Sequence, residues 1–93
     1  MKKNKKLKVS IVMGSQSDYK TMKLSVKILK MMGIKYETKI ISAHRTPKRM
    51  FDFALSAEKN NIGAIIAGAG GSAHLPGMIS SLTAIPVLGV PIE

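Results

Sequence analysis

Three short polar segments carry residue types that can bind a small anionic molecule and move a proton on it. They are residues 14–18 (GSQSD), 42–45 (SAHR) and 68–74 (GAGGSAH). Hydroxyl groups and glycine-exposed backbone N–H groups suit phosphate and sugar oxygens, and a histidine exchanges a proton near neutral pH. These three segments are therefore the candidates for a binding and catalytic site.

In the second segment, His44 is the one side chain that can act as a general acid or base near neutral pH. Arg45 beside it offers a planar donor fork that can bind phosphate in a bidentate manner. A histidine in a loop is more often structural or solvated, and an arginine there is often a surface residue. Their adjacency favours the functional interpretation.

The first segment precedes a predicted helix, whose free N–H groups and dipole favour an anion such as phosphate. Ser15 and Ser17 add hydroxyl donors, whereas the carboxylate of Asp18 would repel a phosphate and suits sugar hydroxyls better. The alternative is that Ser17 or Asp18 only caps the helix.

In the third segment, the glycines from Gly68 to Gly71 let the backbone approach a ligand closely. Neither the dinucleotide-binding fingerprint nor the phosphate-loop pattern is met. His74 is either a second active-site group or a helix-start hydrogen-bonding residue. With two histidines thirty residues apart, no cysteine and few carboxylates, we expect no metal site and no cofactor.

Alternating apolar and amphipathic stretches predict βαβ units and a parallel sheet. We expect strands at residues 7–13, 34–41, 64–67 and 85–90, with Pro91 following the last strand, and helices at 18–32, 47–60 (after an N-cap at Thr46) and 76–82. Gly33 should end the first helix in a left-handed conformation, and the alternation in 34–41 places that strand near an edge. The expected core residues of the first two helices are Met22, Val26 and Leu29, widened by Leu24, Ile28 and Met31, and then Met50, Phe51, Ala54 and Ala57.

Each of the three polar segments follows a predicted strand. Right-handed crossovers bring the carboxyl ends of parallel strands to one rim of a sheet, where ligands bind in open α/β folds. We therefore expect the three segments to converge on one site.

The composition fits one small domain, with a basic flexible tail at residues 1–8 and a single α/β domain at 9–93. Five of the fifteen basic residues lie in that tail, and the chain has no Trp and only two Tyr and two Phe, so we expect no nucleic-acid partner. No apolar run approaches the roughly 20 residues of a membrane span, and cysteine is absent, so a cytoplasmic protein is expected.

Four sequence signatures resemble one enzyme family, the N5-carboxyaminoimidazole ribonucleotide mutases. These are MGSQSD at residues 13–18, SAHRTP at 42–47, AGAGGSAHLPGM at 67–78 and PVLGVP at 86–91. The resemblance covers about residues 8–93. It implies a flavodoxin-like three-layer αβα fold with a parallel sheet, and a step of de novo purine synthesis that moves a carboxylate from N5 to C4 of an aminoimidazole ribonucleotide without metal, ATP or biotin.

The resemblance also assigns roles by motif. It implies His44 as the proton-transfer residue and Ser15, Asp18 and Arg45 as substrate-binding residues, with Ser17 and Ser42 as secondary candidates. The segment with Ala69, Gly70, Gly71 and His74 would line the base. Related carboxylases that use free CO2 typically carry Lys-Gly where this chain has Arg45-Thr46, which favours the mutase branch.

The family chain continues beyond the fourth strand and assembles into a homo-octamer, so we expect a sheet cut short after that strand. An inactive nucleotide-binding fragment is one alternative, and a basic nucleic-acid-binding module is a less favoured one.

Overall fold

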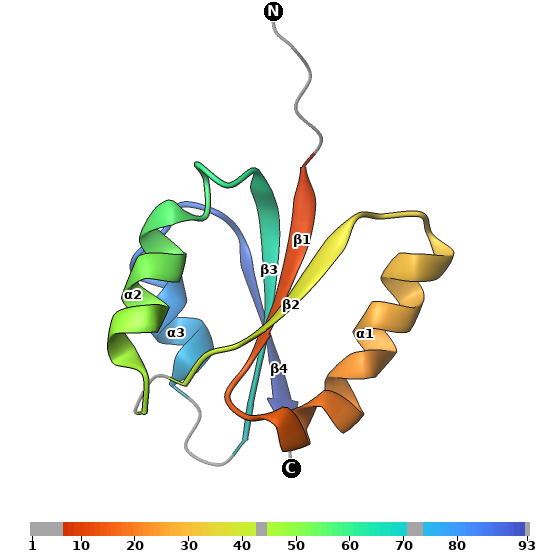
Figure 1. Cartoon of the computed structure of the whole chain (residues 1–93), viewed down its shortest axis with the longest axis horizontal. Coiled ribbons are helices and arrows are strands. Elements are labelled where there is room, and N and C mark those ends of the chain that lie inside the picture. Colours follow the sequence, from red (N-terminus) through yellow and green to blue (C-terminus); the bar gives the residue numbers. More distant parts are fainter. Residues whose placement is uncertain (1–6, 43–44, 71–73, 93) are drawn as a thin grey trace, which may run out of the picture.

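The computed structural model describes residues 7–42, 45–70 and 74–92, which form one four-stranded parallel sheet with helices on both faces (Figure 1). The elements, in chain order, are β1 (Lys8–Met13), the 3-10 turn η1 (Gln16–Asp18), α1 (Tyr19–Met31), β2 (Tyr36–Ile40), α2 (Pro47–Ser56), β3 (Ile62–Gly70), α3 (Leu75–Ser80) and β4 (Val87–Ile92). The strand order is β2-β1-β3-β4, so β2 is an edge strand, as predicted.

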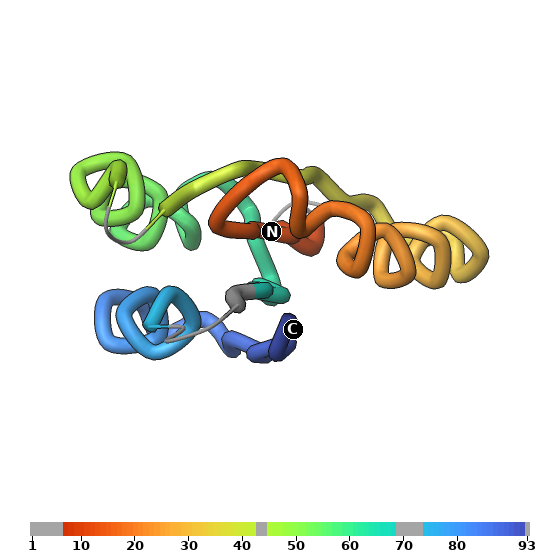
Figure 2. Tube along the Cα trace, turned by 90° about the horizontal axis from the view of Figure 1, so that it is seen from below, coloured from red at the N-terminus to blue at the C-terminus, as the bar shows by residue number. Residues whose placement is uncertain are grey.

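The elements form three layers. Helix α1 covers one face of the sheet, and α2 and α3 cover the other (Figure 2). Each face has its own apolar cluster: Met22 and Leu29 of α1 pack with Ile11 and Met13, while α2 and α3 pack against the other face over a cluster that includes Val12, Ile65 and Ala67. This is the predicted flavodoxin-like α/β architecture.

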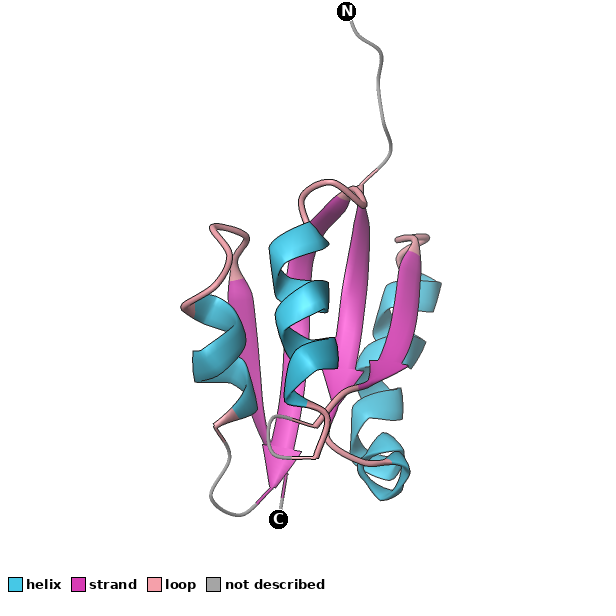
Figure 3. Ribbon diagram, turned by 60° about the vertical axis from the view of Figure 1, so that its left-hand side comes forward, coloured by secondary structure: helices cyan, strands magenta, loops and turns pink. Residues whose placement is uncertain are grey.

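The strands end together at one edge of the sheet, where their arrowheads point in Figure 3. Met13 at the end of β1 pairs with Ile40 of β2 and with Gly68 of β3. Just past β2, the N–H of the buried Ile41 donates to the carbonyl of Met13 at 2.8 Å and fastens the two strand ends to each other. The rim predicted from the sequence is therefore present.

Two predictions about helix faces are wrong. In α1, Leu24, Ile28 and Met31 do not widen the buried stripe, because helical spacing turns them away from Met22 and Leu29, and they are 61%, 56% and 80% exposed. In α2 the core residue is Phe53 rather than Phe51, because Phe53 lies three positions after the buried Met50 whereas Phe51 lies one position, or about 100°, around the helix.

Several boundaries also differ from the predictions. Strand β3 extends to Gly70 because Ala69 and Gly70 pair with Pro91 and Ile92, so Pro91 lies within β4 rather than after it. Lys8 is the first residue of β1, one residue after the start of the strand predicted at residues 7–13. Helix α2 ends at Ser56 rather than near residue 60, and α3 is the shorter segment 75–80.

The helix stop at Gly33 is confirmed by its positive φ of 72°. Its N–H donates to the carbonyl of Lys30 at 3.2 Å, which satisfies one of the free carbonyls at the end of α1. Among the described residues, no helix combines the length and apolarity needed to cross a membrane.

Candidate active site at the carboxyl end of the sheet

The strand order places a topological switch point between β1 and β3. The chain leaves β1 toward one face through α1 and leaves β3 toward the opposite face through α3. Loops that diverge in this way leave a crevice at the strand ends, where open α/β sheets bind their ligands. Segments 14–18 and 68–74 flank this point, and segment 42–45 follows the neighbouring strand β2.

The first loop, residues 14–18, is stabilised by a hydrogen bond between two of its serines. Ser15 has an extended backbone, and its Oγ lies 2.8 Å from the Oγ of Ser17 in a hydrogen bond. The Ser15 carbonyl also accepts the N–H of Asp18 at 3.1 Å, which closes the single turn η1. One hydroxyl of the serine pair accepts and the other donates, so a free hydroxyl hydrogen remains for an anion.

Asp18 stands at the N-cap position of α1, yet its side chain makes no capping hydrogen bond. The backbone of Asp18 is already helical, with φ −72° and ψ −17°, whereas a capping residue usually has an extended backbone. The carboxylate instead turns back toward the strand end, since a Cβ built on Gly14 would lie 3.7 Å from Asp18 Oδ2. The geometry thus disfavours the capping interpretation for Asp18, and Ser17 bonds to Ser15 rather than to the helix.

The second loop is closed by Thr46. Its Oγ1 accepts the N–H of Ser42 at 3.0 Å and donates to the Ser42 carbonyl at 3.1 Å. The Oγ of Ser42 accepts the N–H of Arg45 at 3.0 Å. Ser42 therefore positions the loop. Thr46 is the N-cap residue of α2, as predicted, but its side chain bonds back across the loop and makes no capping hydrogen bond. The spacing of two hydroxyl residues four positions apart was the signal for this contact.

His44, the predicted proton-transfer residue, lies with Ala43 outside the described residues. Arg45 is exposed and lines a shallow hollow of about 470 Å³ at the start of α2, together with Pro47 and Asp52. Another hollow, of about 910 Å³, opens beside the ends of β1 and β2, and Met13, Gln16, Tyr19, Ile40 and Arg49 are among its lining residues. Arg49 lines both hollows and was not predicted as a site residue.

The glycine-rich segment is partly strand. Ala69 and Gly70, predicted as loop residues that line the base, belong to β3, while Gly71 lies outside the described residues. Gly68 has a packing role: a Cβ at this position would overlap Met22 Sδ and lie 2.9 Å from Ile92 Cδ1. The absence of a side chain at Gly68 therefore allows close contact between β3, β4 and α1.

His74 is the N-cap residue of α3 and is exposed. Its side chain makes no capping hydrogen bond, and its carbonyl accepts the N–H of Met78 at 2.9 Å. The position keeps His74 at the same edge of the sheet as the two other segments. Among the described residues, no three histidine or acidic side chains lie close enough together to hold a metal ion.

A partly buried polar network lies away from the rim, and sequence reasoning missed it. Glu37 Oε2 accepts the hydroxyl of the fully buried Ser10 at 2.9 Å, and Glu37 Oε1 lies 2.8 Å from Lys8 Nζ. Burial alone would raise the pKa of Glu37, but hydrogen bonds from Lys8 and Ser10 and the charges of Lys8 and Lys39 outweigh it and hold that pKa below its ordinary value. Glu37 is thus a charged, structural carboxylate.

The AIR carboxylase family model matches residues 8–93. A protein from Saccharolobus solfataricus named N5-carboxyaminoimidazole ribonucleotide mutase is 58% identical over 85 residues, which are 91% of this chain and 54% of the relative. A protein of the same name from Vibrio parahaemolyticus is 56% identical over 87 residues, which cover 94% of this chain and 54% of the relative. The chain thus spans about half the length of the curated relatives it matches.

Two solved structures share the fold. A PurE2 variant from Treponema denticola superimposes with a TM-score of 0.88 at 27% identity, over 96% of this chain and 57% of the other. PurE from the same organism has a TM-score of 0.85 at 29% identity, over 91% of this chain and 54% of the other. The arrangement of the strands and helices is therefore that of the PurE proteins.

Proposed function

The chain belongs to the AIR carboxylase family, and from this premise we propose that its rim serves the interconversion of N5-carboxyaminoimidazole ribonucleotide and 4-carboxy-5-aminoimidazole ribonucleotide. The observation that carries the proposal is that β1, β2 and β3, each followed in the chain by one of the three polar segments, end at the same edge of the sheet next to its switch point. Each segment lies within the region that the relatives named as mutases match at 50 to 58% identity.

In the proposed site, the phosphate, the ribose and the base of the substrate are bound by different residues of the three segments. The serine pair and the backbone N–H groups at the start of the η1 turn suit the phosphate, with Arg45 as a second phosphate ligand and Ser42 bracing its loop. The Asp18 carboxylate makes no cap and suits the ribose hydroxyls. Ala69, Gly70, Gly71 and His74 form the side of the site that faces the base.

In the proposed reaction the N5–carboxylate bond breaks and releases CO2, and the ring carbon C4 then attacks that CO2 to form a new C–C bond. The proton on C4 must leave, and N5 must gain one, so the net reaction moves a proton from C4 to N5. We assign that transfer to His44, because an imidazole both accepts and donates a proton near neutral pH. No metal, redox step or added cofactor enters this balance.

Arg45-Thr46 favours the mutase over a carboxylase that uses free CO2. The hydroxyl of Thr46 closes the loop through both backbone groups of Ser42. A glycine at this position has no such hydroxyl. The proposal further includes a cytoplasmic location and, for a protein of the relatives' full length, assembly into a homo-octamer.

The test measures conversion of N5-carboxyaminoimidazole ribonucleotide by the chain itself and by the chain joined to the C-terminal half of the Vibrio parahaemolyticus relative. We expect activity in the joined protein, and a loss of about 10²- to 10⁴-fold in its His44→Asn variant. Lys27→Gln, an exposed change on α1, is the matched control and should keep full activity.

Two results would reject the proposal. One is a folded joined protein with no activity, which would favour an inactive nucleotide-binding fragment. The other is a His44→Asn variant as active as the parent, which would remove His44 from the mechanism. Conversion of the unsubstituted ribonucleotide with bicarbonate, without conversion of the N5-carboxy compound, would instead identify a carboxylase.

A further inference from the structure

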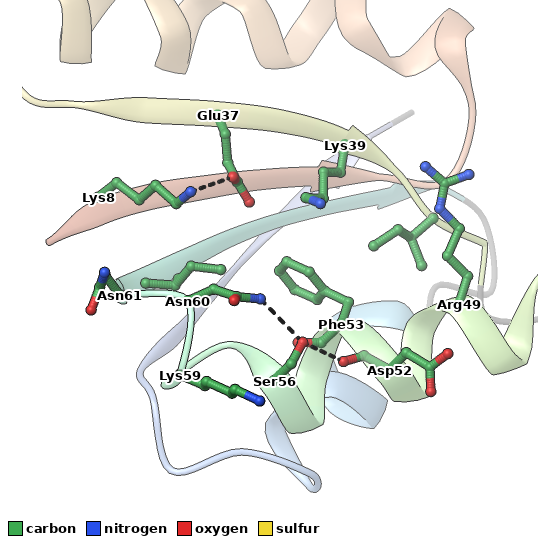
Figure 4. A pocket seen from close by; sticks show the side chains of 12 residues that line it. Lys8, Glu37, Lys39, Arg49, Asp52, Phe53, Ser56, Lys59, Asn60 and Asn61 are labelled. Atoms are coloured by element: carbon green, nitrogen blue, oxygen red, sulfur yellow. Dashed lines mark hydrogen bonds and ion pairs between the residues drawn. The ribbon is translucent and has the colours of Figure 1, made fainter.

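A polar groove of about 550 Å³ runs between the edge strand β2 and helix α2 (Figure 4). One end is lined by Lys8, Asn61 and Ile62, which lie at the starts of β1 and β3 and so at the opposite edge of the sheet from the rim. The groove extends from there past Glu37 and Lys39 to Arg49 near the beginning of α2. The groove therefore begins at the edge of the sheet opposite the proposed substrate site.

Four cationic and two anionic side chains line the groove. Glu37 is satisfied by Lys8 and Ser10, and Asp52 pairs with Lys48 at 3.2 Å on the exposed surface of α2. In the described part of the chain, the remaining cations Lys39, Arg49 and Lys59 have no carboxylate within ion-pair distance. The groove thus has an excess of positive charge that the described residues do not neutralise.

The floor of the groove is apolar. It consists of Ile41, Phe53 and Ile62, which are 1%, 7% and 3% exposed. Lys39 reaches over this floor, with its Nζ 6.0 Å from the centre of the Phe53 ring (Figure 4). This contact holds the ammonium group above the aromatic face.

We propose that this groove is a second binding site, which takes a phosphorylated small molecule. Its volume lies within the roughly 300–1,000 Å³ of small-molecule sites, and it joins an apolar floor to a few placed charges. Arg49 supplies a planar fork for phosphate oxygens, and Lys39 and Lys59 supply point charges on either side of the floor. The groove shares Lys39 and Arg49 with the hollow beside the ends of β1 and β2, but Phe53, Lys59 and Asn60 line the groove and not that hollow.

The test is a titration of the full chain with inorganic pyrophosphate at constant ionic strength, followed residue by residue through backbone amide NMR signals. We expect saturable shifts at Lys39, Phe53 and Asn60. Lys39→Gln and Arg49→Gln should each raise the dissociation constant about tenfold or more, since each removes a charge-assisted contact. Lys39→Arg should restore most of the affinity.

Lys27→Gln is the matched control, because it removes the same charge from an exposed position on α1 outside the groove. Equal weakening by Lys27→Gln and Lys39→Gln would show attraction to net charge only and overturn the proposal. Shifts confined to Ser15–Asp18, or no saturable binding, would also overturn it. Far-UV circular dichroism of each variant ensures that a loss of binding is not a loss of fold.

Discussion

The hydroxyl of Thr46 bonds both backbone groups of Ser42, accepting its N–H at 3.0 Å and donating to its carbonyl at 3.1 Å. One side chain therefore closes the loop that carries SAHR, and the N–H of Arg45 adds a third bond to the Ser42 hydroxyl at 3.0 Å. The loop between the end of β2 and the start of α2 is held by these contacts at both ends. These bonds hold the backbone of Arg45 at the rim, and no carboxylate in the described part of the chain pairs with its side chain.

Thr46→Val removes the hydroxyl and keeps the shape of the side chain. We expect it to lower the free energy of unfolding by about 1 kcal/mol, because two hydrogen bonds to Ser42 are lost from an exposed loop. In the joined protein it should also raise KM, since Arg45 is less well positioned. Thr46→Ser keeps the hydroxyl and is the control. Equal KM values for the two variants would contradict the positioning role.

Asp18→Ala separates the binding role of the carboxylate from helix capping. Asp18 makes no capping hydrogen bond. We therefore expect the free energy of unfolding, measured by urea denaturation, to change by less than about 0.5 kcal/mol, whereas the loss of a cap would lower it by about 1 kcal/mol. The joined protein should bind the ribonucleotide at least tenfold more weakly, as calorimetry can measure. A large loss of stability with unchanged binding would restore the capping interpretation.

Gly68→Ala tests the close packing between β3 and α1. The added methyl would overlap the thioether of Met22, which is fully buried and must shift into its neighbours. We expect a loss of about 1–3 kcal/mol in the free energy of unfolding, measured by urea denaturation.

Gly77→Ala is the matched control for Gly68→Ala. Nothing lies within 4 Å of a Cβ at Gly77, which is in helix α3. Alanine favours the helix over glycine, so a gain of about 0.5–1 kcal/mol is expected. Destabilisation of similar size in both variants would mean that packing against Met22 is not what Gly68 permits.

Glu37 should give the chain a pH-dependent stability. Its pKa is lowered in the folded protein, so the stabilisation is fully present above the unfolded pKa of about 4.3 and is lost as the pH falls through the folded pKa. Glu37→Gln should cost about 1 kcal/mol at pH 7, because the Lys8 ion pair is only partly shielded from water. The difference in the free energy of unfolding between the parent and Glu37→Gln should shrink below pH 4.

The control is Asp52→Asn, since the ion pair of Asp52 with Lys48 is largely exposed. Its effect should stay below about 0.5 kcal/mol at every pH. Urea midpoints at pH 7 and pH 3.5 provide the comparison. If the difference in urea midpoint between the parent and Glu37→Gln is the same at both pH values, the charge of the Glu37 carboxylate does not contribute to stability.

Sequence periodicity predicted the fold class, the edge position of β2 and the stop at Gly33, because each follows from local patterns of apolar residues and glycine. It failed for Phe51 and Phe53, since both residues are apolar and only the orientation of α2 decides which one is buried. It also ended β3 too early, because small residues such as Ala69 and Gly70 look like a loop until a neighbouring strand pairs with them.

The sequence by itself determined which segments carry chemistry and the family to which they belong, since motif identity resides in residue order. The tertiary structure decided what neighbouring side chains do. It showed that Thr46 closes the Ser42 loop, that the Asp18 side chain makes no cap, and that Glu37 bonds Lys8 and Ser10 while Lys39 lies over the Phe53 ring. These relationships depend on distances between side-chain atoms. Strand pairing and helix packing set those distances, and local sequence patterns do not show them.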